Sequence, residues 1–211
     1  MNSIYQDKHL LLCDKPAGTL SQPAPGQEES MISLLQEAVG TAVFPVHRLD
    51  RGTGGLMVYA KTQKAAALLS ESIRRRDFTK EYLCVVQGIP TEPAATLTDL
   101  LYWDAARNKS FPVTRERKGV KAASLEYVTL GTAGNTTLLK VQLHTGRTHQ
   151  IRVQFASRKH PLLGDRKYGA DSAGEIALWS HRLAFSHPIT GKALDFTLPP
   201  PAEAPWSQFH I

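Results

Sequence analysis

The sequence predicts one α+β domain over residues 1–211, and three observations lead to this fold class. Segments with strand character outnumber helical segments, turns typical of hairpins join several of the strands, and strands and helices do not alternate regularly along the chain. A length of 211 residues suits one domain with a substantial core.

The N-terminal part predicts a strand and a helix. Residues 9–14 are mostly apolar and indicate a short buried strand, which the turn-forming residues 15–18 end. Ser30 can cap a helix with an apolar side, and Gly40 is a typical stop.

The next part predicts a loop, a strand, a helix and a second strand. Three glycines within residues 52–55 indicate a tight loop before a strand at residues 56–60. Thr62 can cap a helix whose last residues are Arg74, Arg75 and Arg76, where the positive charges complement the helix dipole. Residues 80–87 then predict a strand.

The middle of the chain contains one irregular segment. Residues 91–120 are polar and become basic toward their end, so we expect a surface excursion without regular structure. Residues 123–130 and 137–143 predict two antiparallel strands. We expect Thr148 to open a helix that runs to about Ser157.

The last elements are two strands, at residues 176–185 and 193–198. His187-Pro188-Ile189-Thr190-Gly191 lies between them and is typical of a turn. These residues therefore predict a C-terminal hairpin.

The composition indicates a globular protein with a polyanionic partner. Hydrophobic residues make up 42% of the chain and charged residues 21%, and the formal net charge is +6. A positive charge favours nucleic acid as the partner. Cys13 and Cys84 each lie in an apolar stretch, which favours buried free thiols and a cytoplasmic location.

Several functional classes find no support in the sequence. No segment resembles a signal peptide, and no apolar run approaches the roughly 18 residues of a membrane span. Phosphate-binding glycine motifs and metal-ligand spacings are also lacking. We therefore expect a monomer without cofactor, metal, membrane contact or obligate protein partner.

Asp50 is the first candidate functional residue. It lies between Arg48 and Arg51 and precedes the glycines, so its surroundings favour ionisation and its loop can face a ligand. Taken alone, the segment is more typical of a surface turn with a capping aspartate.

Residues 145–153 form a second candidate segment. Gly146 permits a turn, and Arg152 lies one helical turn after His149. Taken alone, its arginines could equally be solvated helix charges and His149 a structural histidine.

Together the two segments resemble the signatures of the RluA-like RNA pseudouridine synthases. His47-Arg48-Leu49-Asp50 resembles the loop of that family, and Gly146-Arg147-Thr148-His149-Gln150-Ile151-Arg152 resembles its later helix start. The resemblance covers nearly the whole chain, in family order, through the segments 14–18, 80–82, 160–165, 168–169 and 187–188.

The resemblance implies a mixed, largely antiparallel sheet with flanking helices and a central cleft. It implies that Asp50 is the catalytic aspartate, that Arg152 pairs with it, and that Tyr82 stacks on the base. Arg48 matches an arginine that engages RNA, and Lys80, Arg147 and His149 are further RNA-binding candidates. From its strand pattern alone, Tyr82 could equally be a core aromatic.

The chain departs from the family pattern in the catalytic loop. Relatives commonly carry an acid and a serine where this chain has Gly52 and Gly54. We expect these glycines to make the loop more flexible.

The implied reaction breaks a glycosidic bond and rejoins the uracil to the same sugar, so it requires no electron or group carrier. Transfer RNA and large-subunit ribosomal RNA are both candidate substrates. The basic residues between 140 and 169 predict a phosphate-binding stripe, namely Lys140, Arg147, Arg152, Arg158, Lys159, Arg166 and Lys167.

Two other functions remain open from the sequence. A non-catalytic RNA-binding module would keep the fold without turnover. A metal-dependent hydrolase would use Asp50, His47 and His149, although a second carboxylate at ligand spacing is lacking.

Overall fold

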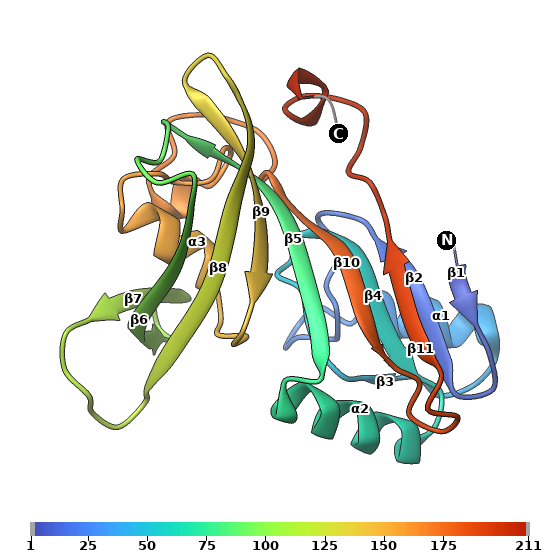
Figure 1. Ribbon diagram of the computed structural model, residues 1–211. Helices are drawn as coiled ribbons and strands as arrows, with labels where there is room; N and C mark the ends of the chain where they lie inside the picture. The colour runs from blue at the N-terminus through green and yellow to red at the C-terminus, as the bar shows by residue number, and fades with distance from the viewer. Residues whose placement is uncertain (1–2, 210–211) are drawn as a thin grey trace. The chain divides into compact units, whose positions relative to one another are not determined.

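The computed structural model describes residues 3–209, which divide into two compact units (Figure 1). Unit 1 takes the chain up to Lys80 together with residues 179–199. Unit 2 takes residues 81–178 and the chain from Pro200.

The sheet of unit 1 is mixed. Its main strands follow the order β1 (Ser3–Gln6), β2 (Leu10–Lys15), β4 (Gly54–Ala60) and β10 (Leu178–Ser186). Two further strands, β3 (Phe44–Pro45) and β11 (Ala193–Thr197), pair with β4 and β10. β4 and β10 run parallel, and the other pairs are antiparallel. The predicted C-terminal hairpin is therefore confirmed as β10–β11.

Both helices of unit 1 begin and end where the sequence predicts. In α1 (Met31–Val39), Ser30 and Ser33 form a reciprocal capping box, and Gly40 ends the helix with a left-handed φ of 67°. In α2 (Gln63–Arg75), the Thr62 side chain accepts a hydrogen bond from the amide of Ala65.

A hydrophobic core fills unit 1 where α2 meets the sheet. Leu12, Val58 and Leu183 come from three neighbouring strands, and Leu69 comes from α2. Phe78 stacks on Phe185 with ring centroids 4.7 Å apart. These contacts bury β4, which begins directly after the Asp50 segment.

The sheet of unit 2 is antiparallel. Its strands follow the order β5 (Phe78–Gln87), β9 (Thr136–Leu143), β8 (Val120–Ala133), β6 (Ala94–Asp104) and β7 (Lys109–Val113). β5 starts in unit 1 and enters unit 2 at Glu81. The prediction that residues 91–120 are irregular is wrong, because β6 and β7 form a hairpin that extends the sheet from the long strand β8.

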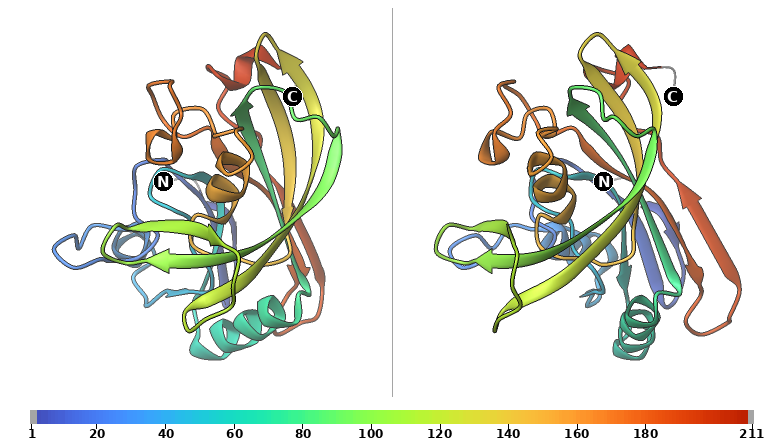
Figure 2. Two further views of the ribbon diagram at one scale, coloured as in Figure 1. Left: turned by 90° about the vertical axis from the view of Figure 1, so that its left-hand side faces the viewer. Right: turned by 60° about the vertical axis from the view of Figure 1, so that its left-hand side comes forward.

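One helix, α3 (Gln150–Ala156), covers a face of the unit 2 sheet (Figure 2). Its Phe155 packs edge to face against Tyr127 of β8, with ring centroids 5.3 Å apart. The expected cap at Thr148 is wrong. The Gln150 side chain instead accepts a hydrogen bond from the Arg147 amide, and the chain enters the helix through His149 in a left-handed conformation.

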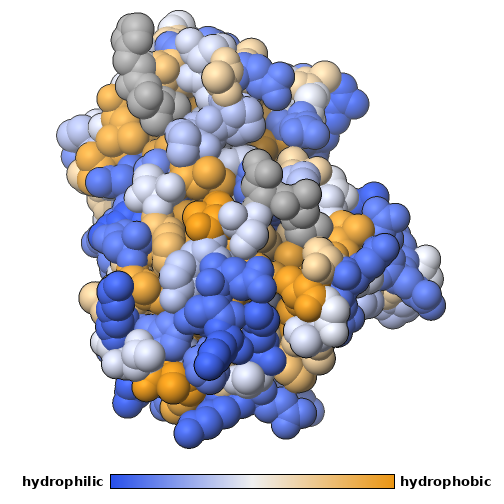
Figure 3. All heavy atoms as spheres, turned by 90° about the vertical axis from the view of Figure 1, so that its right-hand side faces the viewer, coloured by the Kyte–Doolittle hydropathy of each residue, from blue (hydrophilic) through white to orange (hydrophobic). Residues whose placement is uncertain are grey.

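The predicted α+β class is confirmed. Besides the α-helices, the described residues form two short 3-10 helices, η1 (Arg166–Tyr168) and η2 (Trp206–Gln208). No helix among residues 3–209 is long and apolar enough to cross a membrane. On the face drawn in Figure 3, hydrophobic residues form separate patches among hydrophilic ones.

Candidate active site

Asp50 lies in a turn that hydrogen bonds fix at several points. The Thr53 amide donates to the Asp50 carbonyl at 3.0 Å, which closes the turn. Arg51 and Gly18 bind each other reciprocally: the Gly18 amide donates to the Arg51 carbonyl and the Arg51 Nε to the Gly18 carbonyl, each at 2.8 Å. The turn is therefore joined to the segment that follows β2.

Lys15, the last residue of β2, is fully buried and lies against this turn. Its Nζ donates to the carbonyl oxygens of Thr53 at 2.7 Å, Pro16 at 2.9 Å and Arg51 at 3.2 Å. Burial lowers the pKa of Lys15 to about 8, although the charge of Asp50 acts in the opposite direction. The ammonium thus holds the loop backbone and places a positive charge in the surroundings of Asp50.

Lys15 has a role in the site that we did not predict from the sequence. The available signal was the position of a lysine at the end of an otherwise apolar strand, directly before Pro16. Such a lysine must either reach the surface or find acceptors inside the protein.

His47 supports the same segment from the other side. Its Nε2 accepts a hydrogen bond from the Val58 amide at 3.3 Å, which continues the β3–β4 ladder through a side chain. Burial and the nearby charge of Lys80 lower the pKa of His47 to about 3. His47 is therefore neutral and uses its Nε2 lone pair within the fold.

The geometry of His47 counts against the metal-hydrolase alternative. A nitrogen that accepts a backbone hydrogen bond is not free to bind a metal. Across residues 3–209, no group of three histidine, cysteine, aspartate or glutamate side chains could hold a metal ion.

The glycines at the start of β4 are required by close packing. A Cβ on Gly54 would lie 2.9 Å from Cε3 of Trp179 and closer still to Cζ3. Gly55 has φ of 107°, and a Cβ there would lie 2.8 Å from the Ser180 nitrogen. The expectation that Gly54 loosens the loop is wrong, because Gly54 is buried in a strand beneath an indole ring.

Tyr82 lies on the face of the unit 2 sheet that α3 covers. Along the antiparallel ladder it is opposite Val141, which is opposite Tyr127, so all three side chains share that face. Tyr82 is 5% exposed. The prediction of an inward-facing aromatic is consistent with this burial.

Arg152 projects from α3 and forms a buried ion pair with Asp165. Its Nε lies 2.6 Å from Oδ2 and its Nη2 lies 2.9 Å from Oδ1, and the two side chains are 7% and 1% exposed. The guanidinium carbon also lies 5.1 Å from the centre of the Tyr168 ring. Asp165 therefore fixes the orientation of Arg152.

Between residues 140 and 169 of the sequence, Asp165 is the one acid beside seven basic residues. This pattern was the available signal for its role, because a single carboxylate among basic residues is expected to pair with an arginine.

Tyr168 joins α3 to the β6–β7 hairpin. Its hydroxyl accepts a hydrogen bond from the Ser110 amide at 2.7 Å and lies 3.0 Å from Nδ1 of His149. Burial raises the pKa of Tyr168 to about 12. The His149 ring also packs edge to face against Trp103 of β6. His149 is thus held by aromatic neighbours at the start of α3.

The remaining RNA-binding candidates differ in exposure. Arg48 is exposed, whereas Lys80 is only 9% exposed, and burial lowers its pKa. Arg147 is partly exposed, and its Nε donates to the carbonyl of Ala122 at 2.8 Å.

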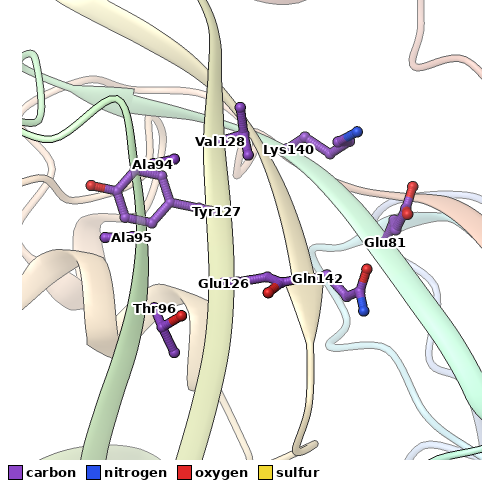
Figure 4. Close-up of a pocket in the computed structure, with 9 residues that line it drawn as sticks. All are labelled: Glu81, Ala94, Ala95, Thr96, Glu126, Tyr127, Val128, Lys140 and Gln142. Atoms are coloured by element: carbon purple, nitrogen blue, oxygen red, sulfur yellow. The ribbon is translucent and has the colours of Figure 1, made fainter.

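The predicted phosphate-binding stripe is not a continuous exposed surface. Arg152 is buried, and Arg158 pairs with Asp99 at 2.9 Å. Lys140 belongs to the face of the sheet opposite Tyr82, where it lines a pocket of about 380 Å³ with Glu81 and Glu126 (Figure 4). Only part of the predicted stripe can therefore face one RNA strand.

The candidate residues divide between the two units. Unit 1 contains Arg48, Asp50 and Lys80. In this unit the charge of Asp50 acts on Lys15, and the charge of Lys80 acts on His47. Unit 2 contains Tyr82, Arg147, His149 and Arg152.

The fold is that of a pseudouridine synthase domain. The family model described as RNA pseudouridylate synthase matches residues 9–157. The chain resembles two solved human structures titled RNA Pseudouridylate Synthase Domain Containing 4 and 1, with TM-scores of 0.77 and 0.75 at 22% and 20% identity. These structures cover 94% of this chain, which covers 88% and 83% of theirs.

Curated proteins of similar sequence carry the same activity in their names. The dual-specificity RNA pseudouridine synthase RluA of Pasteurella multocida is 33% identical, over 95% of this chain and 93% of its own. The ribosomal large subunit pseudouridine synthase D of Zymomonas mobilis is 32% identical, over 92% and 67%. An uncharacterized RNA pseudouridine synthase of Synechocystis is 32% identical, over 96% and 66%.

This chain belongs to the RNA pseudouridylate synthase family and is RluA-like. The activity of that family is an isomerisation. The predicted family and fold are confirmed.

Proposed function

We propose that this protein converts uridine to pseudouridine in structured RNA, with Asp50 as the catalytic carboxylate. The observation that carries the proposal is the restraint on the Asp50 turn. Lys15 binds two of its carbonyls, Gly18 binds Arg51, and β4 is packed tightly directly after it. Such restraint is expected of a reacting group, because small displacements of the reacting atoms reduce the rate strongly.

The chemistry assigns one role to the carboxylate and one to the aromatic residue. The bond between the sugar carbon and the uracil nitrogen breaks, the uracil rotates, and a bond forms between the same sugar carbon and C5 of the uracil. Asp50 starts this sequence either by attacking the sugar carbon or by removing a sugar proton. Tyr82 receives the flipped base and assists loss of the proton from C5. C5 loses a proton and N1 takes one up, so the product is an isomer of uridine and no co-reactant is needed.

We propose Arg152 as a further catalytic residue, as the family resemblance implies. Asp165 occupies one edge of the guanidinium, through Nε and Nη2. We therefore propose Asp165 as the residue that positions Arg152.

We propose that the RNA is a transfer RNA, a large-subunit ribosomal RNA or both. One relative is named as a ribosomal large subunit enzyme, and another is named as dual-specificity. Phosphate contacts are supplied by basic residues of the β6–β7 hairpin, of the connection from β7 to β8 and of the start of β8. We call this set the β6–β7 basic surface: Arg107, Lys109, Arg115, Arg117, Lys118 and Lys121. Arg117 lies 4.8 Å from the ring centre of Tyr102, and Lys109 lies 5.7 Å from that of Phe111. Basic residues alternating with aromatic ones are typical of surfaces that bind single-stranded RNA. We also propose a cytoplasmic location, which the two free thiols support.

The substrate is tested by mapping pseudouridines in total RNA from cells with and without the gene. We expect at least one site in transfer or ribosomal RNA to be lost and to return with the wild-type protein. Asp50→Asn should not restore it, whereas Asp77→Asn, at an exposed position after α2, should. An unchanged map in both RNA classes would contradict the substrate proposal.

A further inference from the structure

Trp179 and Gly54 are partners in the short parallel pairing between β10 and β4. The register places Trp179 opposite Gly54 and Ser180 opposite Gly55. Gly54 is the first residue of β4 and follows Asp50 by four positions. This pairing therefore sets the point at which the Asp50 turn becomes a strand.

The indole ring of Trp179 fills the space that a side chain at position 54 would need. A Cβ there would lie 2.9 Å from Cε3 and closer still to Cζ3, distances that real Cβ atoms do not adopt. The ring cannot easily move aside, because its Nε1 donates to the Leu198 carbonyl at 3.0 Å and it is 8% exposed. Gly54 and Trp179 thus require each other.

The two sides of the turn are held by different residues. Lys15 donates to the carbonyl of Thr53 on one side, and its own carbonyl lies 3.3 Å from the position of a Cβ on Gly54. Trp179 covers Gly54 on the other side. A shift of β4 away from Trp179 would therefore change the Lys15–Thr53 contact and, through it, the Asp50 turn.

We propose that Trp179 is a positioning residue, whose indole, seated on Gly54, fixes the start of β4 and thereby the Asp50 carboxylate. The inference rests on the proposed catalytic role of Asp50. It also explains why this chain has glycine at position 54, where the family pattern has serine. The Cβ of a serine there would clash with the indole of Trp179. The reaction rate, rather than RNA affinity, should then depend on the fit between residues 54 and 179.

A double-mutant cycle tests this coupling. The variants are Gly54→Ser, Trp179→Leu and the double variant, with tritium release from 5-tritiated uridine RNA as the assay under single-turnover and steady-state conditions. We expect each single variant to lower kcat by about tenfold or more, through overpacking or a cavity, with KM for RNA within about twofold of wild type. The double variant should recover most of the lost kcat, because leucine leaves room for the serine.

Two further variants serve as controls for loss of folding and for the specificity of the coupling. Gly54→Ala adds only the clashing carbon, and thermal unfolding identifies any variant that is not folded. Trp206→Leu removes another buried tryptophan, which lies in unit 2, and its effect on kcat should simply add to that of Gly54→Ser.

The possible outcomes separate the two proposals. Folded Gly54→Ser and Gly54→Ala proteins with wild-type kcat, or a double variant no better than the product of the single effects, would overturn the role of Trp179. Tritium release by Asp50→Asn at the wild-type rate would instead overturn the proposed function, whatever the cycle shows.

Discussion

Arg152 and Asp165 form a bidentate ion pair that is almost completely buried in unit 2, with its two hydrogen bonds at 2.6 and 2.9 Å. Removing one partner of a buried pair leaves an uncompensated charge, whereas an exposed pair contributes little. The chain offers both cases. Arg182 and Asp195 form a bidentate pair at 2.7 and 2.8 Å whose side chains are 33% and 54% exposed.

Asp165→Ala should reduce both stability and activity. Because Arg152 would keep its charge without this partner, we expect a loss of about 3–5 kcal/mol in the free energy of unfolding. The matched change Asp195→Ala should cost no more than about 1 kcal/mol. Urea unfolding measures both values, and equal losses in the two variants would contradict the role given to Asp165.

Tyr168→Phe should loosen the contact between α3 and the β6–β7 hairpin. The substitution removes the acceptor of the Ser110 amide but keeps the ring beside Arg152. A buried amide left without its acceptor costs about 1–3 kcal/mol. Hydrogen exchange should show faster exchange at Ser110, and unchanged protection there would count against this contact.

Activity should fall as the pH rises through about 8. Lys15 is charged below its pKa of about 8 and neutral above it, so its positive charge beside Asp50 is lost in that range. Lys15→Met should have low activity without this alkaline decline. Lys61→Met, which removes a lysine bound to the Asp7 carbonyl, should keep it.

The stability of the fold should change in the opposite sense. Folding lowers the pKa of Lys15 from its ordinary value of 10.5 to about 8. Between these two pH values the unfolded chain therefore binds the proton more tightly than the folded protein does. The contribution of Lys15 to stability therefore rises with pH in this window. An activity decline that coincides with unfolding would contradict the assignment to Lys15.

Asp7 should contribute to stability only above acidic pH. Burial alone would raise the pKa of Asp7, but hydrogen bonds from His9, Leu10, Tyr5 and His187 outweigh it and lower the pKa to about 2. This contribution is complete above the ordinary value of 3.8 and is lost as the pH falls through about 2. Asp7→Asn should be less stable than wild type at pH 6, with a smaller decline toward pH 2. Parallel curves for the two proteins would exclude Asp7 as the source.

The β6–β7 basic surface should contribute to RNA affinity by neutralising phosphates. Changing Arg115, Arg117 and Lys118 to glutamine should weaken binding and reduce the slope of log affinity against log salt by about 0.7–0.9 for each phosphate that is no longer neutralised. The same change at Arg74, Arg75 and Arg76, which are exposed at the end of α2, serves as the control. Equal effects of the two triple variants would contradict a localised RNA surface.

The sequence predicted the ends of α1 and α2 correctly. Ser30, Gly40 and Thr62 act as caps at the predicted places, because capping needs only residues within one turn. The β6–β7 hairpin could not be predicted in this way. β6 pairs with the distant strand β8, β7 pairs with β6, and the apolar alternation of both strands is weak.

The partners of buried charges were also beyond the sequence. Lys15 and Asp165 are ordinary surface residue types, and their burial depends on acceptors and donors that the fold brings from distant positions. The prediction that Gly54 loosens the loop was wrong for the same reason, because its packing partner Trp179 lies 125 positions later in the chain. The family resemblance supplied the roles of Asp50, Tyr82 and Arg152, and these remain predictions.

The most direct test of the catalytic role of Asp50 is tritium release from 5-tritiated uridine RNA by purified wild type, Asp50→Asn and the control Asp77→Asn. Wild type and Asp77→Asn should release tritium with equal rate constants. Asp50→Asn should bind the RNA with an affinity within a few fold of wild type and release none above background. Tritium release by folded Asp50→Asn at a rate near that of wild type would contradict the catalytic role of this carboxylate.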